Sequence, residues 1–497
     1  ILILNVLMGS VEPKGGLFFK KGPGEVGRKP ARKLTDQKFS AVKAPRIDKV
    51  GTPDFPLPDP EHGVPQMLPQ AILSEDPYPL KALFAFRMDP LMSMPDTNLT
   101  KKALQKLDLV VACDINWSDI AWWSDVVLPE SVFLERTDCV QQANGQKPQM
   151  FLRRRAVPPR YDTRDWAVIV KQLAERIGAG DFFPYQDTEE LVRWQLEGTG
   201  FTLEDFDKTG FVAYTDKQIL WDRLGGLKLK TPSQKIEFKS SLLENAGFPS
   251  FPPYEPVPAY EGNRFRLITG RAALHTHVST QNNPYLHELL PENELWIHAR
   301  RAAALGVKDG ALVTVASRVG SGQIRARVTE HIHPDCVFLL HGFGHEAAFA
   351  ARACGRGVSD ALLEENLTDR VGGSPALHDT TVTVQPPRRE TAHEPVLPLP
   401  GHQELHRLPL LRDRLQEQQG PADRPQALPG DPRRPPPGER PAARLLRLHA
   451  LLPLPEPLVR RRLPDRGDAQ AAPGRDRLRR ARSLRGLQDL HHRLPLG

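Results

Sequence analysis

A dense row of hydrogen-bonding side chains follows Gly270. Between this glycine and Asn283 the chain places an arginine, two histidines and several hydroxyl and amide side chains. Buried polar groups need hydrogen-bond partners, so an enclosed row of this kind would suit a polyphosphate or a fused heterocycle rich in ring nitrogens. The alternative is a hydrated surface loop in which Asn and Ser shape turns. The candidate ligand residues are Gly270, Arg271, His275, Thr276, Thr280, Gln281, Asn282 and Asn283.

A carboxylate at the end of an apolar run is the second candidate. Apolar runs over 82–86, 109–112 and 125–128, with a helix predicted from 97 to 107, are typical of a parallel sheet with crossover helices. Ligands of such sheets bind beyond the carboxyl ends of the strands, and Asp114 lies at such an end. The alternative role for Asp114 is to cap the helix that follows.

Two further elements are predicted on either side of the polar row. Upstream, a helix over 165–177 has Ile169, Leu173 and Ile177 on the side expected to face the core. Downstream, short alternating strands with glycine turns continue to Gln385.

One of the downstream turns reads H-G-F-G-H, residues 341–345. Its glycines let the backbone approach a ligand closely. Its two histidines have a spacing that could indicate a metal site, but the intervening glycines argue against a helix, so no metal is predicted. Arg356, between two glycines, is a further candidate contact for a phosphate.

The order of these motifs resembles the C-terminal part of the molybdopterin oxidoreductases, the dimethyl-sulfoxide-reductase superfamily. The segments T-G-R, H-T, S-T-Q-N-N, P-E-N, H-G-F-G-H and G-R-G-V-S-D are similar to those of polysulfide and thiosulfate reductase catalytic subunits. The resemblance covers most of the chain up to about residue 386. It implies an α/β fold, in which a parallel-sheet dinucleotide-binding domain precedes a C-terminal six-stranded β-barrel of the double-psi type.

The same resemblance implies a cofactor, molybdenum bis(molybdopterin guanine dinucleotide). Asp114 would accept hydrogen bonds from N1 and N2 of guanine, and Glu135 and Asn144 would brace the adjoining loops. Relatives often show Asn two residues after the serine that corresponds to Ser359, where this chain has Ala. Either Asn366 supplies that pterin contact or the contact is lost. The barrel adds His341, Gly342, Gly344, Arg356 and Asn366 to the expected cofactor-binding residues, and no catalytic residue or metal ligand is identified.

Composition and the resemblance together predict the domain organisation. Residues 1–25 resemble the remnant of a catalytic core, so the N-terminal iron–sulfur domain, an export signal and the molybdenum ligand are expected upstream of Ile1. The four cysteines stand far apart with no C-x-x-C pair, which excludes a local cluster or zinc site by spacing. The expected divisions are 1–25, an extended insertion over 26–75, the α/β domain over 76–180, a connecting region over 181–262, the barrel over 263–386 and a tail over 387–497.

The tail has a composition unlike the rest of the chain. It is rich in Leu, Pro and Arg, and its leucines recur as Leu405, Leu408, Leu411 and Leu415, and again as Leu484, Leu487, Leu490 and Leu494. These gaps match the cysteine spacing of ferredoxin-type clusters, and CTN leucine codons read one base later can encode cysteine. The shifted text resembles a four-cluster iron–sulfur subunit, so we expect a disordered tail that is a frameshifted fusion into the neighbouring gene. Its arginines account for most of the net charge of +7, so no nucleic-acid partner is predicted.

These observations favour part of a catalytic subunit that reduces a sulfur compound, namely polysulfide, thiosulfate or tetrathionate, in anaerobic respiration. The expected partners are an iron–sulfur electron-transfer subunit and a membrane anchor subunit, with the complex on the periplasmic face of the membrane. The alternatives are another branch of the superfamily, such as arsenate, selenate or nitrate reductases or formate dehydrogenases, and a non-catalytic cofactor-binding remnant.

Overall fold

The computed structural model describes residues 2–36, 44–58, 63–219, 229–251 and 253–386. The predicted tail lies outside the described residues, as do parts of the 26–75 insertion. Among the helices that are described, none combines the length and the apolar character needed to cross a bilayer.

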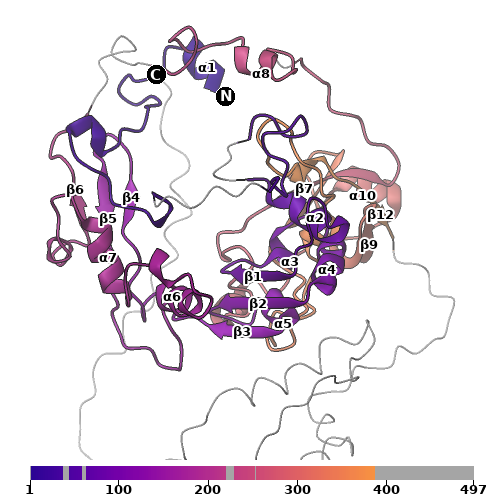
Figure 1. The fold of residues 1–497 in the computed structure, drawn as a ribbon. Coiled ribbons are helices and arrows are strands. Elements are labelled where there is room, and N and C mark those ends of the chain that lie inside the picture. The colour runs from indigo at the N-terminus through magenta and orange to yellow at the C-terminus, as the bar shows by residue number, and fades with distance from the viewer. Residues whose placement is uncertain (1, 37–43, 59–62, 220–228, 252, 387–497) are drawn as a thin grey trace, which may run out of the picture. The chain divides into compact units, whose positions relative to one another are not determined.

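A parallel sheet forms the first part of the fold. Of the described residues, Ala82–Phe86 (β1), Leu109–Asp114 (β2) and Val126–Pro129 (β3) make a three-stranded sheet in the order β1-β2-β3. The helix Thr97–Lys106 (α4) connects β1 to β2, and Asp119–Trp123 (α5) connects β2 to β3 (Figure 1). The parallel pairing confirms the expectation of a parallel sheet with crossover helices that was drawn from three apolar runs.

A closed barrel forms the second part. Its described strands are Arg264–Gly270 (β7), Leu295–His298 (β8), Leu312–Ala316 (β9), Ser321–Thr329 (β10), Cys336–Leu340 (β11) and Thr381–Gln385 (β12). They close in the order β10-β8-β11-β7-β12-β9, with β10 parallel to β8 and β11 parallel to β7. This confirms the expected six-stranded barrel.

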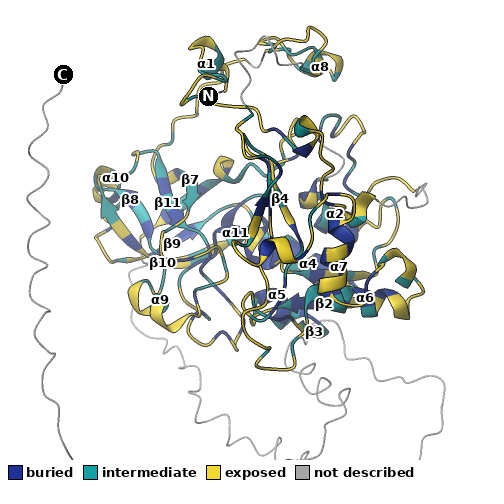
Figure 2. Ribbon diagram, turned by 90° about the vertical axis from the view of Figure 1, so that its left-hand side faces the viewer, coloured by how far each residue is buried: buried dark blue, intermediate teal, exposed yellow. Residues whose placement is uncertain are grey.

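The barrel interior is apolar and fully enclosed. Alternate residues of its strands point inward, as the period of two requires, and Phe265, Leu267, Ile297, Leu339 and Val382 are completely buried. Figure 2 shows buried residues gathered in the barrel strands and around the parallel sheet. A packed interior leaves no room for a ligand, so binding has to use the loops at the ends of the strands.

A small antiparallel sheet occupies the middle of the chain. Gln141–Ala143 (β4) and Gln149–Phe151 (β5) pair with each other, and β5 pairs with Phe211–Ala213 (β6). The helices Trp166–Arg176 (α6) and Thr188–Leu196 (α7) lie between β5 and β6 in sequence. The remaining helices are Leu2–Leu7 (α1), Leu68–Ser74 (α2), Pro90–Ser93 (α3), Ser241–Asn245 (α8), Pro284–Leu289 (α9), Ala299–Leu305 (α10) and Asp360–Leu363 (α11).

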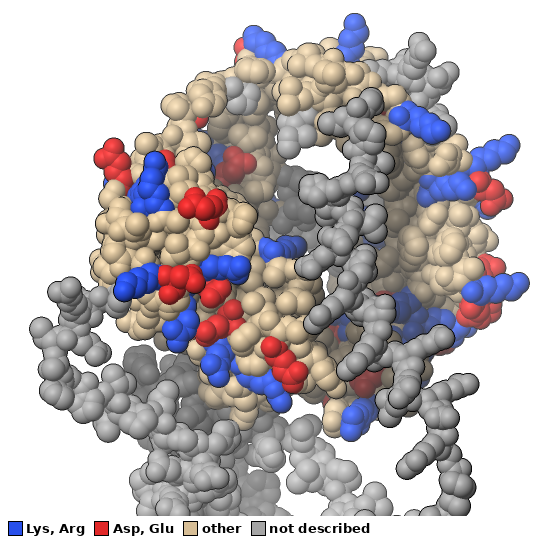
Figure 3. All heavy atoms as spheres, turned by 180° about the vertical axis from the view of Figure 1, so that it is seen from behind, with Lys and Arg blue, Asp and Glu red and all other residues tan. Residues whose placement is uncertain are grey.

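The face turned to the viewer in Figure 3 carries positive and negative side chains interspersed. Several ion pairs elsewhere in the described residues join exposed side chains, such as Arg154 with Glu189 at 3.5 Å. Exposed pairs of this kind contribute at most about 1 kcal/mol each to stability, so the fold depends on its apolar interior.

Candidate cofactor-binding cleft

A cleft of about 560 Å³ lies at the carboxyl ends of the parallel strands. One wall comes from the segments that follow β1 and β2, and the other from the polar loop after β7 and the loop after His345. Both sequence-predicted sets, Asp114 and part of the polar row, therefore meet in one place. The lining residues are Arg87, Met88, Asp89, Asp114, Ile115, Asn116, Trp117, Ser118, Arg136, Val278, Ser279, Thr280, Asn282, Asn283, His345, Ala350 and Ala353.

Asp114 is the last residue of β2, and its carboxylate is held by its own loop. One oxygen accepts a hydrogen bond from Ile115 N at 2.7 Å, and the other accepts one from Ser118 Oγ at 2.7 Å. The cap of α5 is Ser118, whose hydroxyl accepts from Ala121 N, so Asp114 is not needed for capping. Because each carboxylate oxygen can accept a further hydrogen bond, Asp114 can bind a group with two adjacent N–H donors.

Two arginines that sequence reasoning missed line the cleft, and each is paired with a carboxylate. Arg87 follows β1 with a φ of 49°, a left-handed conformation that is uncommon for a residue with a side chain. Its Nε donates to Glu130 Oε2 at 2.7 Å, and this bond raises the pKa of the guanidinium. Arg136 NH1 lies 3.5 Å from the same, fully buried Glu130 carboxylate. The position of Arg87 at the carboxyl edge of a predicted strand was the available signal.

The polar row after β7 divides into ligands and supports. His275 is buried, with one ring nitrogen 3.2 Å from Thr280 Oγ1 and the other 2.9 Å from Leu290 O. Gln281 is also buried and donates to His277 O at 2.6 Å. The polar atoms of these two predicted ligand residues form hydrogen bonds within the loop, whereas Thr280, Asn282 and Asn283 line the cleft.

The two asparagines of the row each have one atom already engaged. Asn282 Oδ1 accepts from Arg352 N at 2.9 Å, which leaves its NH₂ group for the cleft. Asn283 Oδ1 caps α9 by accepting from Tyr285 N at 3.0 Å and Leu286 N at 3.3 Å. Its NH₂ group is the donor that remains for a ligand.

Other predicted site residues lie outside the lining of this cleft. Glu135 accepts from Arg160 N at 3.2 Å, Asn144 accepts from Gln142 Nε2 at 2.9 Å, and Asn366 donates to Gln66 O at 3.0 Å. The Glu135 contact joins two segments 25 positions apart, whereas the Asn144 contact is local, between residues two positions apart. The remaining residues that do not line it are Gly270, Arg271, Thr276, His341, Gly342, Gly344 and Arg356.

The glycines of the H-G-F-G-H turn are required by the chain's own backbone. Gly342 has a φ of 98°, and a Cβ there would lie 2.3 Å from His277 O. Gly344 has a φ of 83°, and a Cβ there would lie 2.3 Å from Ser359 N. The glycines were predicted to let the backbone approach a ligand closely. In the structure, the backbone of two neighbouring loops lies against them instead, and this packing fixes the turn.

Two buried acidic groups lie beside the turn. His341 Nδ1 is 2.7 Å from Asp360 Oδ2, and Thr269 Oγ1 is 3.1 Å from Glu364 Oε1. Burial, and then the neighbouring Asp360, raises the pKa of Glu364 to about 8. Glu364 is therefore mostly protonated at neutral pH.

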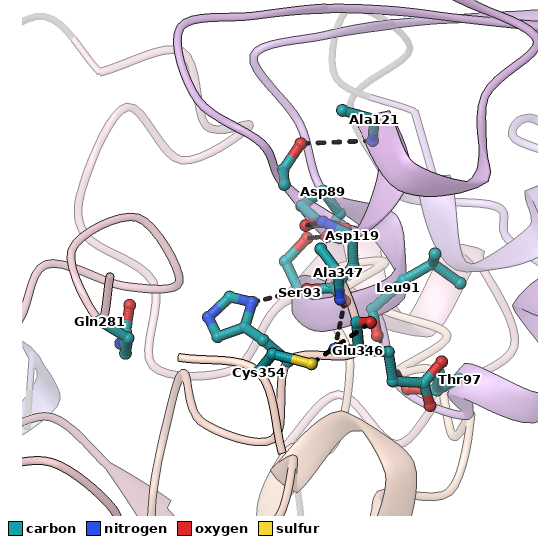
Figure 4. A network of polar contacts seen from close by, with 12 residues as sticks. Asp89, Leu91, Ser93, Thr97, Asp119, Ala121, Gln281, Glu346, Ala347 and Cys354 are labelled. Atoms are coloured by element: carbon teal, nitrogen blue, oxygen red, sulfur yellow. Dashed lines mark hydrogen bonds and ion pairs between the residues drawn. The ribbon is translucent and has the colours of Figure 1, made fainter. Parts of the chain in front are cut away.

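A buried network fastens the loop after β11 to the sheet. Asp119 Oδ1 accepts from Glu346 N at 2.6 Å and Ala347 N at 2.9 Å, and its Oδ2 lies 2.5 Å from His345 Nδ1. Asp89 Oδ2 accepts from Asp119 N at 2.8 Å. Figure 4 shows Asp89, Asp119, Glu346 and Ala347 converging. Sequence reasoning missed this network, because residues 119 and 345 are brought together only by the fold.

The network leaves two polar atoms unsatisfied next to the cleft. Asp89 Oδ1 and His345 Nε2 are buried and have no hydrogen-bond partner among the described residues. Burial, followed by the nearby Asp119, raises the pKa of Asp89 to about 7. Both residues contribute to the lining of the cleft.

Comparison with known proteins identifies the family of the chain. The family model described as Molybdopterin oxidoreductase matches residues 4–176, and that described as Molydopterin dinucleotide binding domain matches 265–381. Asp114 lies in the first match and the polar row in the second. The chain belongs to the molybdopterin oxidoreductase family.

Individual relatives come from several branches of the family. The chain is 31% identical over 415 residues to the molybdopterin-containing subunit of thiosulfate reductase from Salmonella typhimurium, covering 77% of this chain and 54% of the relative. It is 30% identical to an assimilatory nitrate reductase catalytic subunit from Bacillus subtilis, covering 52% and 37%. An F420-dependent formate dehydrogenase subunit alpha from Methanocaldococcus jannaschii is also 30% identical, covering 53% and 39%.

A solved structure shares the fold. Acetylene hydratase from Pelobacter acetylenicus superposes with a TM-score of 0.57 at 25% identity, covering 65% of this chain and 46% of that chain. The chain therefore spans about half the length of the relatives it matches.

The lining of the cleft fits the expected family cofactor, molybdenum bis(molybdopterin guanine dinucleotide). Guanidinium, hydroxyl and amide donors are the groups that bind a diphosphate. A fixed carboxylate at Asp114 matches the paired N–H groups of guanine. The lining residues are donors and a carboxylate suited to the dinucleotide portion of the cofactor. Among the described residues, no set of three or more His, Cys, Asp and Glu side chains is arranged to hold a metal ion.

Proposed function

We propose that this chain holds one guanine dinucleotide arm of the molybdenum cofactor in a catalytic subunit that reduces a sulfur compound such as thiosulfate, polysulfide or tetrathionate. The observation that supports the binding role is the cleft itself, where Asp114 faces the loop carrying Thr280, Asn282 and Asn283. The substrate class is supported by the thiosulfate reductase relative, which matches 77% of this chain, against 52% for the nitrate reductase relative.

The residues of the cleft bind and orient. Asp114, fixed by Ile115 N and Ser118 Oγ, accepts from N1 and N2 of guanine. The N–H groups of Arg87 and Arg136 that their carboxylate partners do not occupy donate to the diphosphate, as do the hydroxyl and amide groups of the polar loop. When bound, the cofactor supplies the oxidation–reduction chemistry at its metal, and the protein positions it.

The proposal includes partners and a location. Electrons would pass through an iron–sulfur subunit, and a membrane anchor subunit would hold the complex at the periplasmic face. Purification of the complete complex from its native membrane would test this assembly. Recovery of the catalytic subunit alone, from the cytoplasmic fraction, would contradict it.

The binding role is tested by Asp114→Asn in the complete enzyme. The amide places an N–H₂ group where guanine needs an acceptor, and losing a hydrogen bond to a charged group costs about 1.5–3 kcal/mol. Guanine nucleotide released by acid and measured by chromatography should fall by about tenfold or more at limiting cofactor. Asp108→Asn is the matched control, because Asp108 is exposed at the start of β2. Equal nucleotide content in both variants would refute the role.

The substrate class is tested with the complete enzyme and a reduced viologen dye. Thiosulfate, polysulfide and tetrathionate should each be compared with nitrate, arsenate and selenate, and formate should be tested with an oxidised dye. Turnover of a sulfur compound is the expected outcome. Turnover of nitrate or formate alone would place the chain in the branch of those relatives, and full cofactor content without any turnover would indicate a cofactor-binding remnant.

A further inference from the structure

An exposed indole lines the cleft one turn beyond Asp114. Trp117 is 40% exposed and Ile115 is 41% exposed. Both side chains line the cleft. An exposed tryptophan is unusual, because indole buries a large apolar area when it can. A flat aromatic face beside a carboxylate is the combination that a heteroaromatic base can use, since the face stacks on the base and the carboxylate binds its edge.

The indole is held from behind by a residue of the barrel loop. The Phe349 ring lies 4.8 Å from the Trp117 ring, centroid to centroid, with an interplanar angle of 42°. Phe349 also meets Trp122 of α5 edge-on, at 5.3 Å and 81°. The phenyl ring is thus wedged between two indoles and restricts the orientation of Trp117.

The position of Phe349 depends on the buried network described above. Asp119 binds the backbone N–H groups of Glu346 and Ala347 and the ring of His345, all within four residues of Phe349. On the other side, Ala347, Ala350 and Ala353 pack with Trp122. The loop is therefore fixed to α5 at two places, and the aromatic wedge between them is placed by the fold rather than by local sequence.

We propose that Trp117, braced by Phe349, is the platform on which the guanine base stacks while Asp114 binds the edge of the same base. The inference rests on the proposed function, because it assumes that the dinucleotide occupies this cleft. According to this proposal, Trp117 contacts the guanine base and not the phosphate, and the barrel loop that carries Phe349 helps to form the guanine-binding site.

The test uses the full chain free of cofactor, with GMP as the probe and ribose 5-phosphate as the probe without a base. Trp117→Ala should weaken GMP binding by about fivefold to a hundredfold, the usual effect of removing a stacking partner. Ribose 5-phosphate should bind the variant and the parent alike. Trp117→Phe keeps an aromatic face and should stay within a few-fold of the parent. Calorimetric titration measures all of these constants.

Fluorescence supplies a second measurement that does not depend on affinity. GMP should quench tryptophan emission in the parent chain, because a base stacked on an indole quenches it, and the quenching should disappear in Trp117→Phe. Trp296→Phe is the matched control, since Trp296 lies on β8 and packs against Phe338. Thermal melting of each variant identifies any that fails to fold, in which case Trp117→Phe carries the test.

The outcomes separate the two proposals. If Trp117→Ala binds GMP like the parent while Asp114→Asn does not, the platform is wrong and the cleft assignment stands. If neither variant differs from the parent, or the parent binds no GMP, the base does not occupy this cleft and both proposals fail. Phe349→Ala should weaken GMP binding less than Trp117→Ala, and an effect larger than that of Trp117→Ala would make Phe349 the platform instead.

Discussion

At the scale of single residues, the cleft separates side chains that face a ligand from side chains that hold the loop. Thr280 does both, because it lines the cleft while its hydroxyl accepts from Thr276 N at 2.9 Å and meets His275 Nδ1 at 3.2 Å. Among the described residues, Arg271 forms no hydrogen bond of this kind within the polar loop. Both residues were predicted to be cofactor ligands. In the structure, substitution of Thr280 should lower the stability of the fold, whereas substitution of Arg271 should not.

Thr280→Val should therefore lower both stability and cofactor content. Valine keeps the shape of threonine but removes the hydroxyl, which leaves the Thr276 N–H and the His275 ring without their partner at a cost of about 1–3 kcal/mol. Thr280→Ser keeps the hydroxyl and should stay near the parent. Arg271→Ala should leave the free energy of unfolding unchanged, and because Arg271 lies outside the lining of the cleft, it should change cofactor content less than Thr280→Val. Chemical denaturation and nucleotide quantification measure these effects, and a fully stable Thr280→Val protein would contradict the internal role.

Asp89 gives the protein a pH dependence of known sign. Its pKa is raised from the ordinary 3.8 to about 7, first by burial and then by Asp119, so the folded state favours the protonated form. Stability is then highest at low pH with respect to this group, falls as pH rises from about 4 to about 7, and stays low above that range. Glu364, with its pKa raised to about 8, contributes a loss of the same sign.

Asp89→Asn should remove the buried carboxylate that forms when Asp89 loses its proton. The variant should therefore have a higher melting temperature than the parent above about pH 7. The amide oxygen can still accept from Asp119 N, so the backbone contact at 2.8 Å is kept. Melting curves between about pH 5 and pH 9 should be flatter for the variant than for the parent, and Glu364→Gln should flatten the remaining slope. Parallel curves for parent and variant would show that Asp89 does not titrate in this range.

The site was only partly predictable from the sequence, for a physical reason. Asp114 could be found because the end of an apolar strand is a local signal, and the polar row could be found because its residues are adjacent. His345 and Asp119 form their contact across 226 positions of the chain, and no local pattern encodes it. Trp117 was likewise hidden, because exposure of an indole depends on what the fold leaves uncovered.

At the scale of elements, both main sheets were predictable and one helix face was not. The strands of the barrel and the parallel sheet have clear apolar runs, and the structure places them as expected. The predicted inner face of α6 includes Leu173 and Ile177, which are 41% and 71% exposed. The helix buries Lys171 instead, because its ammonium group donates to Gly180 O at 3.1 Å and Phe183 O at 3.0 Å. Hydrophobic periodicity cannot reveal a buried lysine that is satisfied by distant carbonyl groups.

The contact between α5 and the loop after β11 should depend on the charge of Asp119. Asp119→Asn keeps the shape but weakens three hydrogen bonds to a charged acceptor, at a cost on the order of 2–4 kcal/mol. The melting temperature should fall and the 345–354 loop should become sensitive to protease. Glu346→Gln is the matched control, because the Glu346 side chain is 54% exposed and, among the described residues, its carboxylate pairs with Lys101. An ion pair that is open to solvent on one side in this way contributes about 1 kcal/mol or less. Equal melting of the two variants would contradict this account.

At the scale of the whole chain, the matched families end where the composition changes. The dinucleotide-binding match ends at residue 381, and the leucine spacing that resembles cluster cysteines begins at Leu405. A helical period of 3.6 also gives gaps of three and four. What points to cluster ligands is that both sets of leucines repeat the same order of gaps, three, three and four, which is the order of cysteines in a ferredoxin-type motif.

We therefore predict that residues 387–497 contribute nothing to the stability of the rest. A chain that ends at Pro386 should melt at the same temperature as the full chain, or higher, and bind GMP with the same affinity. Resequencing of the gene should show a single-base shift near the codons for His393 and Glu394, with an iron–sulfur subunit in the overlapping frame. A verified sequence without that frame, together with a lower melting temperature for the shortened chain, would show that the tail is a selected part of this protein.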